Sequence, residues 1–145
     1  MKGTPLLYYS LDDGAAHPRQ AYKYDAGIDL ALKHDLTVPV GVHRVGDTGV
    51  RVAVPRGNVG MVFVRSSTGI KKHLVLSNGT GIIDAGYRGP IKISLHNTGD
   101  TTQHIQAGDY IAQLDIIPIT PNEIAEAREL ATSERGTNGI GSSGK

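Results

Sequence analysis

The chain has 145 residues, the size of one ordinary domain, and its 15 Lys and Arg against 14 Asp and Glu give a formal net charge of +1. A chain this close to neutral lacks the strong positive charge that is typical of proteins that bind duplex nucleic acid or a membrane surface. Cysteine is absent, which excludes disulfides, thiolate metal sites and a cysteine nucleophile.

Short apolar segments separated by turns rich in Gly, Pro, Asn and Asp are predicted as strands. In chain order they span residues 5–11, 27–32, 36–40, 50–54, 59–64, 74–76, 81–83, 91–95 and 110–117. Several alternate apolar and polar residues, and a spacing of about 8–12 residues is typical of a β-sandwich or barrel. No βαβ spacing is present, so the sequence predicts an all-β domain rather than a parallel α/β sheet.

Helix signals are few. Residues 66–73 follow a predicted strand and are expected to form one or two helical turns. Residues 122–130 contain good helix formers behind Pro121, so propensity alone favours a helix there. Residues 135–145 are rich in Gly, and such a segment cannot order itself because its backbone entropy is uncompensated. It is either a disordered end or a flap that orders on a ligand.

The composition also favours self-association. Glycine makes up 19 of the 145 residues, against a usual fraction of about 7%, and the aromatic residues are only six Tyr and one Phe. A domain near this size buries about 70% of its unfolded surface. With so few large side chains, burial of one face against copies of the same chain adds to stability.

Three segments contain candidate functional residues. Residues 65–69, Arg-Ser-Ser-Thr-Gly, combine a guanidinium fork with hydroxyls at a helix start, which suits phosphate; the alternative is a capped helix with a surface arginine. Asp84 lies at a strand end with Tyr87 three residues on, so it is either a turn former or a general base for water. Asp29 lies inside an apolar strand, which suggests that it is held for charge or by hydrogen bonds.

The order of five motifs is far more specific than any one of them. AGIDL, RSSTG, NGTGIIDAGYRG, GDYIAQL and a final ERGTNGIGSSG occur in this order. Together with the linking stretch at residues 38–64, this series resembles that of the trimeric dUTPases over about residues 25–144. The resemblance implies a jelly-roll-like all-β subunit with at most one short helix, assembled as a homotrimer. It divides the chain into a domain at 1–134 and an arm at 135–145 that closes over an active site, and it implies an extended crossing rather than a helix at 122–130.

The implied reaction is hydrolysis of dUTP to dUMP and pyrophosphate with Mg2+. Asp84 matches the carboxylate that activates water for attack on the α-phosphorus. Asp29 matches the carboxylate that holds the waters of the metal ion. Asn78 matches the uracil-reading residue and Tyr87 the ring that packs under deoxyribose. The remaining substrate-binding positions implied by the resemblance are Arg65, Ser66, Ser67, Gln113, Arg135, Ile140, Ser142 and Ser143.

Three residues depart from the family pattern. Tyr110 stands where the family usually has Arg, so one cation near the site or the trimer axis is expected to be missing. Ile140 replaces the Phe that stacks on uracil, and Gly86 replaces a commonly acidic residue. We expect weaker arm closure and a raised KM rather than loss of chemistry.

Two other functions compete with this one. A dCTP deaminase shares the fold, but it needs a Glu where this chain has Ser94. A nucleotide-binding or regulatory protein of the same fold has no need of the base Asp84. No apolar run reaches the ~18 residues of a membrane span and no signal-peptide pattern is seen, so we expect a cytoplasmic protein with neither membrane nor nucleic-acid partners.

Overall fold

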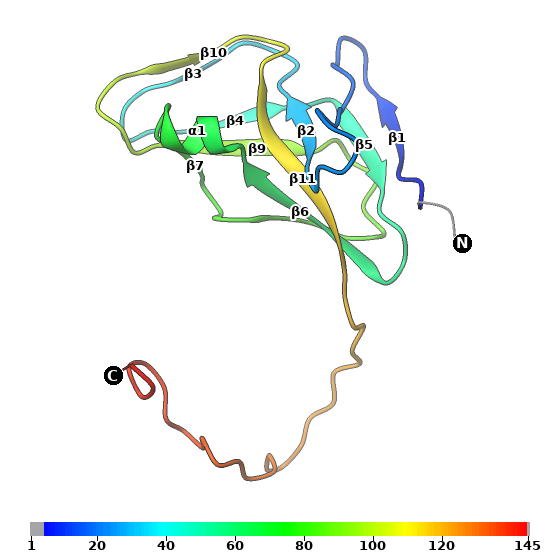
Figure 1. Ribbon diagram of the computed structural model, residues 1–145, viewed down its shortest axis with the longest axis vertical. Coiled ribbons are helices and arrows are strands. Elements are labelled where there is room, and N and C mark those ends of the chain that lie inside the picture. Colours follow the sequence, from blue (N-terminus) through cyan, green and yellow to red (C-terminus); the bar gives the residue numbers. More distant parts are fainter. Residues whose placement is uncertain (1–4, 145) are drawn as a thin grey trace.

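A computed structural model describes residues 5–144; residues 1–4 of the expected domain and Lys145 of the expected arm lie outside this range. Its strands pair antiparallel into four small sheets, ordered β1-β5, β10-β3, β4-β9-β7 and β2-β11-β6-β8 (Figure 1). The strands are β1 (Tyr8–Leu11), β2 (Ile28–Ala31), β3 (Leu36–Val38), β4 (His43–Asp47), β5 (Val50–Ala53), β6 (Asn58–Val64), β7 (Leu74–Leu76), β8 (Gly81–Ile83), β9 (Lys92–Asn97), β10 (Gln103–Ile105) and β11 (Tyr110–Pro118). One short helix, α1 (Ser66–Ile70), follows β6. The predicted all-β jelly-roll class is confirmed.

The core lies between the sheets and consists of aliphatic side chains. Leu30, Val50, Leu74, Leu95 and Leu114 are fully buried. They come from five strands in three of the four sheets. Because strand side chains alternate between two faces, the same strands leave a second set of residues on their outer faces. Of the candidate functional residues, Asp29 and Gln113 lie on strands, and the others lie in the segments that follow β6, β7, β8 and β11.

The strand prediction missed β4 and β10. In β4 the residues His43, Arg44 and Val45 are exposed, and the one buried position is Gly46, which contributes no side chain to an apolar pattern. A Cβ at Gly46 would lie 2.6 Å from the Leu32 side chain, so the core itself requires glycine there. β10 has three residues, of which only Ile105 is buried. Neither strand therefore shows the alternation on which sequence prediction depends.

The structure near both ends of the chain differs from the elements that sequence propensity favours. β1 begins at Tyr8 rather than at residue 5, and it pairs with β5 of the same chain. Residues 122–130 contain no helix and are exposed, as the family resemblance implies. Nine residues of good helix formers without a packing partner are too few for a stable helix. No helix among residues 5–144 is long and apolar enough to cross a membrane.

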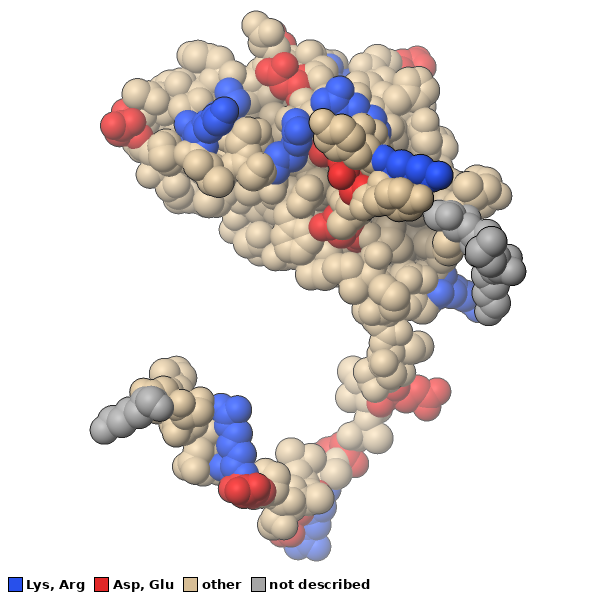
Figure 2. Space-filling model, in the orientation of Figure 1, with Lys and Arg blue, Asp and Glu red and all other residues tan. Residues whose placement is uncertain are grey.

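After β11 the chain leaves the domain. Residues 119–144, which we call the tail, run away from the sheets without forming a strand or helix (Figures 1 and 2). The apolar side chains of Ile124, Leu130 and Ile140 are almost completely exposed. Nothing within the described part of the chain covers them.

Candidate functional site

The first group of predicted site residues lies at one end of the β2-β11-β6 ladder. Asp29 is 7% exposed although its neighbours in β2 are apolar. Its Oδ1 lies 3.3 Å from Nε of Arg65, and Gln113 lies directly opposite it on β11. A cationic partner therefore offsets the burial of the Asp29 carboxylate.

The segment after β6 is fixed to the start of β11. The Arg65 amide donates to the Ile111 carbonyl (3.1 Å), and the buried Thr68 hydroxyl donates to the same oxygen (2.8 Å). Arg65 Nη1 also donates to the Tyr110 carbonyl (3.0 Å). Ser66 and Ser67 begin α1 and are exposed. The arginine is thus rigidly placed, and the two hydroxyls beside it face solvent.

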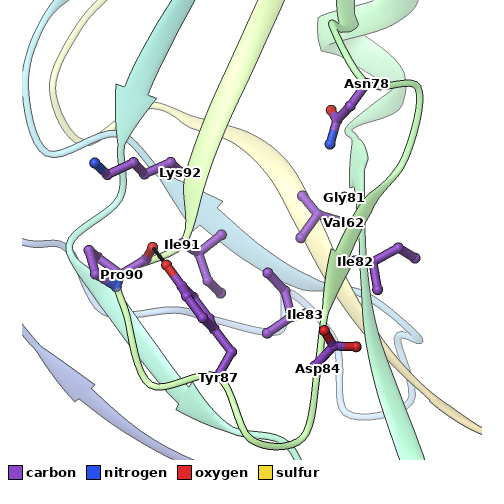
Figure 3. A pocket seen from close by; sticks show the side chains of 10 residues that line it. All are labelled: Val62, Asn78, Gly81, Ile82, Ile83, Asp84, Tyr87, Pro90, Ile91 and Lys92. Atoms are coloured by element: carbon purple, nitrogen blue, oxygen red, sulfur yellow. Dashed lines mark hydrogen bonds between the residues drawn. The ribbon is translucent and has the colours of Figure 1, made fainter.

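The second group lines a hollow between β8 and the start of β9 (Figure 3). Its volume is about 260 Å³, and Asn78, Asp84 and Tyr87 all contribute to its wall. The Tyr87 hydroxyl donates to the Pro90 carbonyl (3.0 Å), which turns the ring toward Ile91 and Ile83. Since ligand pockets usually occupy about 300–1,000 Å³, this hollow suits part of a ligand, such as one base and sugar.

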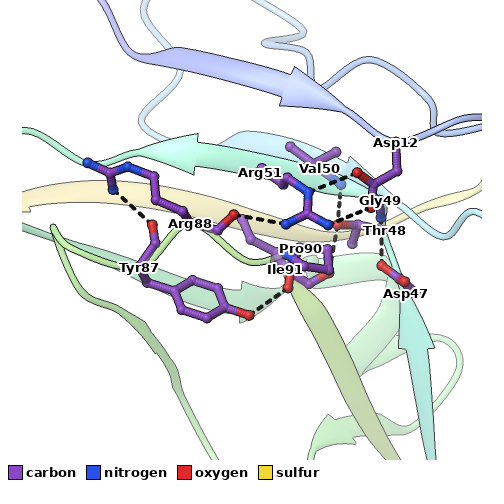
Figure 4. Close-up of polar contacts among 10 residues, drawn as sticks. All are labelled: Asp12, Asp47, Thr48, Gly49, Val50, Arg51, Tyr87, Arg88, Pro90 and Ile91. Carbon is purple, nitrogen blue, oxygen red and sulfur yellow. Dashed lines mark hydrogen bonds and ion pairs between the residues drawn. The ribbon is translucent and has the colours of Figure 1, made fainter.

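A hydrogen-bonded network holds the turn that carries Asp84 and Tyr87 (Figure 4). Arg51 donates through Nε to Asp12 Oδ1 (2.8 Å) and through Nη1 to the Arg88 carbonyl (3.0 Å). The hydrogen bond from Arg51 lowers the pKa of the Asp12 carboxyl. The Tyr87 amide donates to the Asp84 carbonyl (3.0 Å), which closes the turn. The arginine therefore links the N-terminal strand to the loop that positions the candidate base.

The third group lies on the tail. Arg135, Ile140, Ser142 and Ser143 are exposed. Arg135 donates through Nε to the Asn138 carbonyl (2.9 Å), a contact within the tail itself. The structure does not bring these four residues to either of the first two groups.

Asp84 of the second group and Arg65 of the first lie apart within one chain. Ile83 pairs with Gly60, and β8 then runs toward the start of β6, so Asp84 lies beside that end. Arg65 follows the other end of β6. About five or six residues of strand separate them, which at ~3.3 Å per residue is roughly 15–20 Å. Asp84 and Arg65 of one chain therefore cannot both contact the same phosphate group.

Sequence reasoning missed two residues at these groups. Lys92 contributes to the hollow around Tyr87. Its place in the alternating Lys-Ile-Ser pattern of β9 is a signal that it lies on the outer face. Arg19 lies beside Asp29, with Nε 3.8 Å from Oδ2. It precedes the stretch in which the family motifs are clear, so only the fold shows it.

Two features bear on metal and deaminase chemistry. Among residues 5–144 there is no group of three or more His, Cys, Asp or Glu side chains placed to hold a metal ion. Ser94 points from β9 toward Ser77, to which its hydroxyl donates (2.7 Å). A dCTP deaminase needs a carboxylate at this position to transfer a proton at the cytosine amino group, and the two serine hydroxyls do not supply one.

Comparisons with known proteins agree with the motif series. The dUTPase family model matches residues 13–144. A deoxyuridine 5'-triphosphate nucleotidohydrolase of Cutibacterium acnes is 42% identical over 130 residues, covering 89% of this chain and 86% of that protein. One of Corynebacterium jeikeium is 39% identical over 97% of this chain and 94% of its own length.

Solved structures give the same answer. The dUTPase of Staphylococcus bacteriophage 80alpha with dUpNHpp superimposes with a TM-score of 0.89 and 32% identity, covering 98% of this chain and 100% of that chain. A mutant dUTPase from phage phi11 of S. aureus, described with a structural Mg(II) ion, gives a TM-score of 0.78 and 30% identity over 86% of this chain and 98% of its own. The chain belongs to the dUTPase family.

Proposed function

We propose that this chain hydrolyses dUTP to dUMP and pyrophosphate. Its family membership and the likeness to a dUTPase bound to dUpNHpp support the reaction. The observation that carries the residue assignment is that Asn78, Asp84 and Tyr87 share one hollow, while Arg65, Asp29 and Gln113 form a separate polar group. The first set suits a nucleoside and an attacking water, and the second suits a polyphosphate.

In the proposed reaction, Asp84 orients one water and accepts its proton as the water oxygen attacks the α-phosphorus. The bond from that phosphorus to the bridging oxygen breaks, and pyrophosphate leaves with the electron pair. The exposed carboxylate of Asp84 is free to receive the water. Tyr87 packs under deoxyribose and leaves no space for a 2′-hydroxyl, and Asn78 with the backbone around it reads uracil.

Arg65, Ser66, Ser67 and Gln113 bind the phosphate oxygens in this proposal. A rigid guanidinium with hydroxyls beside it matches phosphate geometry. Asp29 is a single carboxylate and not a metal cage, which fits Mg2+ because that ion keeps most of its waters and takes its other ligands from the nucleotide. When bound, the ion neutralises charge on the phosphates. Asp29 would hold waters of the ion from the protein side.

We further propose a homotrimer in which each site combines residues of different chains. Asp84 and Arg65 lie too far apart within one chain, whereas general-base contacts require reach of about 3 Å or one intervening water. The domain formed by residues up to 134 supplies the first two groups. The arm at 135–145 supplies Arg135, Ile140, Ser142 and Ser143 to a site on another copy, which gives the exposed tail residues a partner.

The test is pyrophosphate release from dUTP, dCTP, dTTP and UTP with Mg2+, measured beside the oligomeric mass. We expect release from dUTP alone, by a trimer. Release from none of the four by a folded trimer would reject the hydrolase assignment and leave nucleotide binding. Deamination of dCTP would instead identify the competing activity.

A further inference from the structure

Asp29 faces two arginines, one at each carboxylate oxygen. Arg65 Nε lies 3.3 Å from Oδ1 and Arg19 Nε lies 3.8 Å from Oδ2. The backbone fixes Arg19 in this place, because its amide donates to the Asp29 carbonyl (3.2 Å) and the Asp29 amide donates to its carbonyl (2.7 Å). This isolated antiparallel bridge places a residue from the N-terminal region directly beside Asp29 and the residues proposed to bind phosphate.

The ring of Tyr110 packs against the side chain of Arg19. The guanidinium carbon of Arg19 lies 3.9 Å from the centre of the Tyr110 ring, a cation–π contact. The Tyr110 hydroxyl donates to the His17 carbonyl (2.8 Å), so the ring is anchored to the same segment that carries Arg19. Although residue 110 is not an arginine, its ring thus packs against the positive charge of another residue beside Asp29.

Arg19 keeps its hydrogen-bonding capacity free. Its side chain is 52% exposed, and within residues 5–144 its guanidinium makes the ion pair and the ring contact but no hydrogen bond. A guanidinium carries five N–H donors in a planar fork that matches phosphate oxygens. Two arginines on one carboxylate also leave an excess positive charge, which favours an anionic ligand.

We propose that Arg19 is a second phosphate-binding arginine beside Arg65, and that Tyr110 positions it. The proposal rests on the proposed function, since the anion is the phosphate chain of the nucleotide. Arg19 then acts on the triphosphate, because it lies with Asp29 and Arg65, whereas Asp84 and the turn that carries Tyr87 lie beside the opposite end of β6. Tyr110 acts only through Arg19.

The test compares two ligands, dUpNHpp and dUMP, for wild type and Arg19→Gln. Loss of one charge-assisted hydrogen bond predicts about a tenfold rise in Kd for dUpNHpp and in KM for dUTP. The Kd for dUMP stays within about twofold, because most of the phosphate chain is absent from it. Arg19→Lys keeps the charge but not the fork, and its values should lie between those of wild type and Arg19→Gln.

Tyr110 supplies a coupled test. Tyr110→Leu removes the ring and should raise the Kd for dUpNHpp about threefold, whereas Tyr110→Phe keeps the ring and should change it less. The double variant Arg19→Gln/Tyr110→Leu should bind dUpNHpp no worse than Arg19→Gln alone, because the ring acts through Arg19 and the Tyr110 carbonyl that accepts from Arg65 is kept in every variant. Independent, multiplying effects would overturn the positioning role.

Arg44→Gln is the matched control. Arg44 is an exposed arginine on β4, and within the described part of the chain its side chain donates only to the carbonyl of the preceding residue, His43. It should leave both dissociation constants unchanged. Equal weakening of dUMP and dUpNHpp by both Arg19 variants, or no weakening by either, overturns the proposal. Failure of wild type to hydrolyse dUTP would reject the proposed function instead.

Discussion

Gln113 lies directly opposite Asp29 in the register between β11 and β2, so the two side chains share one face of the sheet. Gln113 can adopt this place because residue 27 is glycine. A Cβ there would lie 2.9 Å from Cδ of Gln113. The close approach of the Gln113 side chain thus requires the glycine of the AGIDL motif.

Gly27→Ala should therefore displace the Gln113 amide and damage activity more than stability. We expect kcat/KM for dUTP to fall on the order of 10–100-fold, since small misplacement of a binding group has effects of that size. Gly46→Ala is the matched control. Its Cβ would meet Leu32 in the core, so overpacking of about 1–3 kcal/mol should lower the Tm while kcat is retained. Equal activities for the two variants would show that Gln113 is not displaced.

Asp29→Asn should change the Mg2+ dependence of the reaction. If the carboxylate holds the waters of the ion, its loss should raise the Mg2+ concentration for half-maximal activity about tenfold. The measurement is a Mg2+ titration at saturating dUTP. Asp100→Asn, in an exposed turn, is the control and should leave the curve unchanged. An unchanged curve for Asp29→Asn would remove the metal role from this residue.

Ile140→Phe should improve substrate binding. An aromatic ring that stacks on uracil adds up to about 1 kcal/mol over an aliphatic side chain, so we expect KM for dUTP to fall up to about fivefold. Ile124→Phe makes the same exchange at another fully exposed tail position, outside the expected arm, and should leave KM unchanged. A KM for Ile140→Phe that is unchanged or higher contradicts the proposed contact of the arm with the base.

Asp115→Asn should stabilise the protein in a pH-dependent way. Burial raises the pKa of the Asp115 carboxyl above its ordinary 3.8, and its Oδ1 is buried with no hydrogen-bond partner among residues 5–144. The folded state thus favours the protonated form, so ionisation lowers stability as the pH rises from about 3.8 and through the folded pKa. The Tm gain of the asparagine variant should be larger at pH 7 than at pH 4.

Thermal unfolding of wild type and variant across that range measures this difference. Asp100→Asn again serves as the control, because it removes an exposed carboxylate. A gain that is equal at both pH values, or a loss of stability at pH 7, would show that the ionised Asp115 carboxylate is not the source of the effect.

The sequence predicts most of this fold because burial imposes an alternating pattern on strands such as β5 and β9. It does not predict β4, whose buried position is a glycine, since a residue without a side chain leaves no pattern. It also identifies Asp29, because burying a carboxylate inside an apolar strand is unfavourable unless a charged or hydrogen-bonding partner offsets the cost. Arg19 escapes prediction because its position depends on a single backbone bridge to Asp29 and on the ring of Tyr110, a residue far away in the chain.

The most direct test of the account is the rate of pyrophosphate release from dUTP by wild type and Asp84→Asn, with Kd for dUpNHpp measured on the same samples. An amide cannot accept the proton of the attacking water, so kcat should fall about 10²–10⁴-fold while Kd changes by less than about threefold. A variant that binds dUpNHpp normally and retains the wild-type kcat would contradict the assignment of Asp84 as the general base.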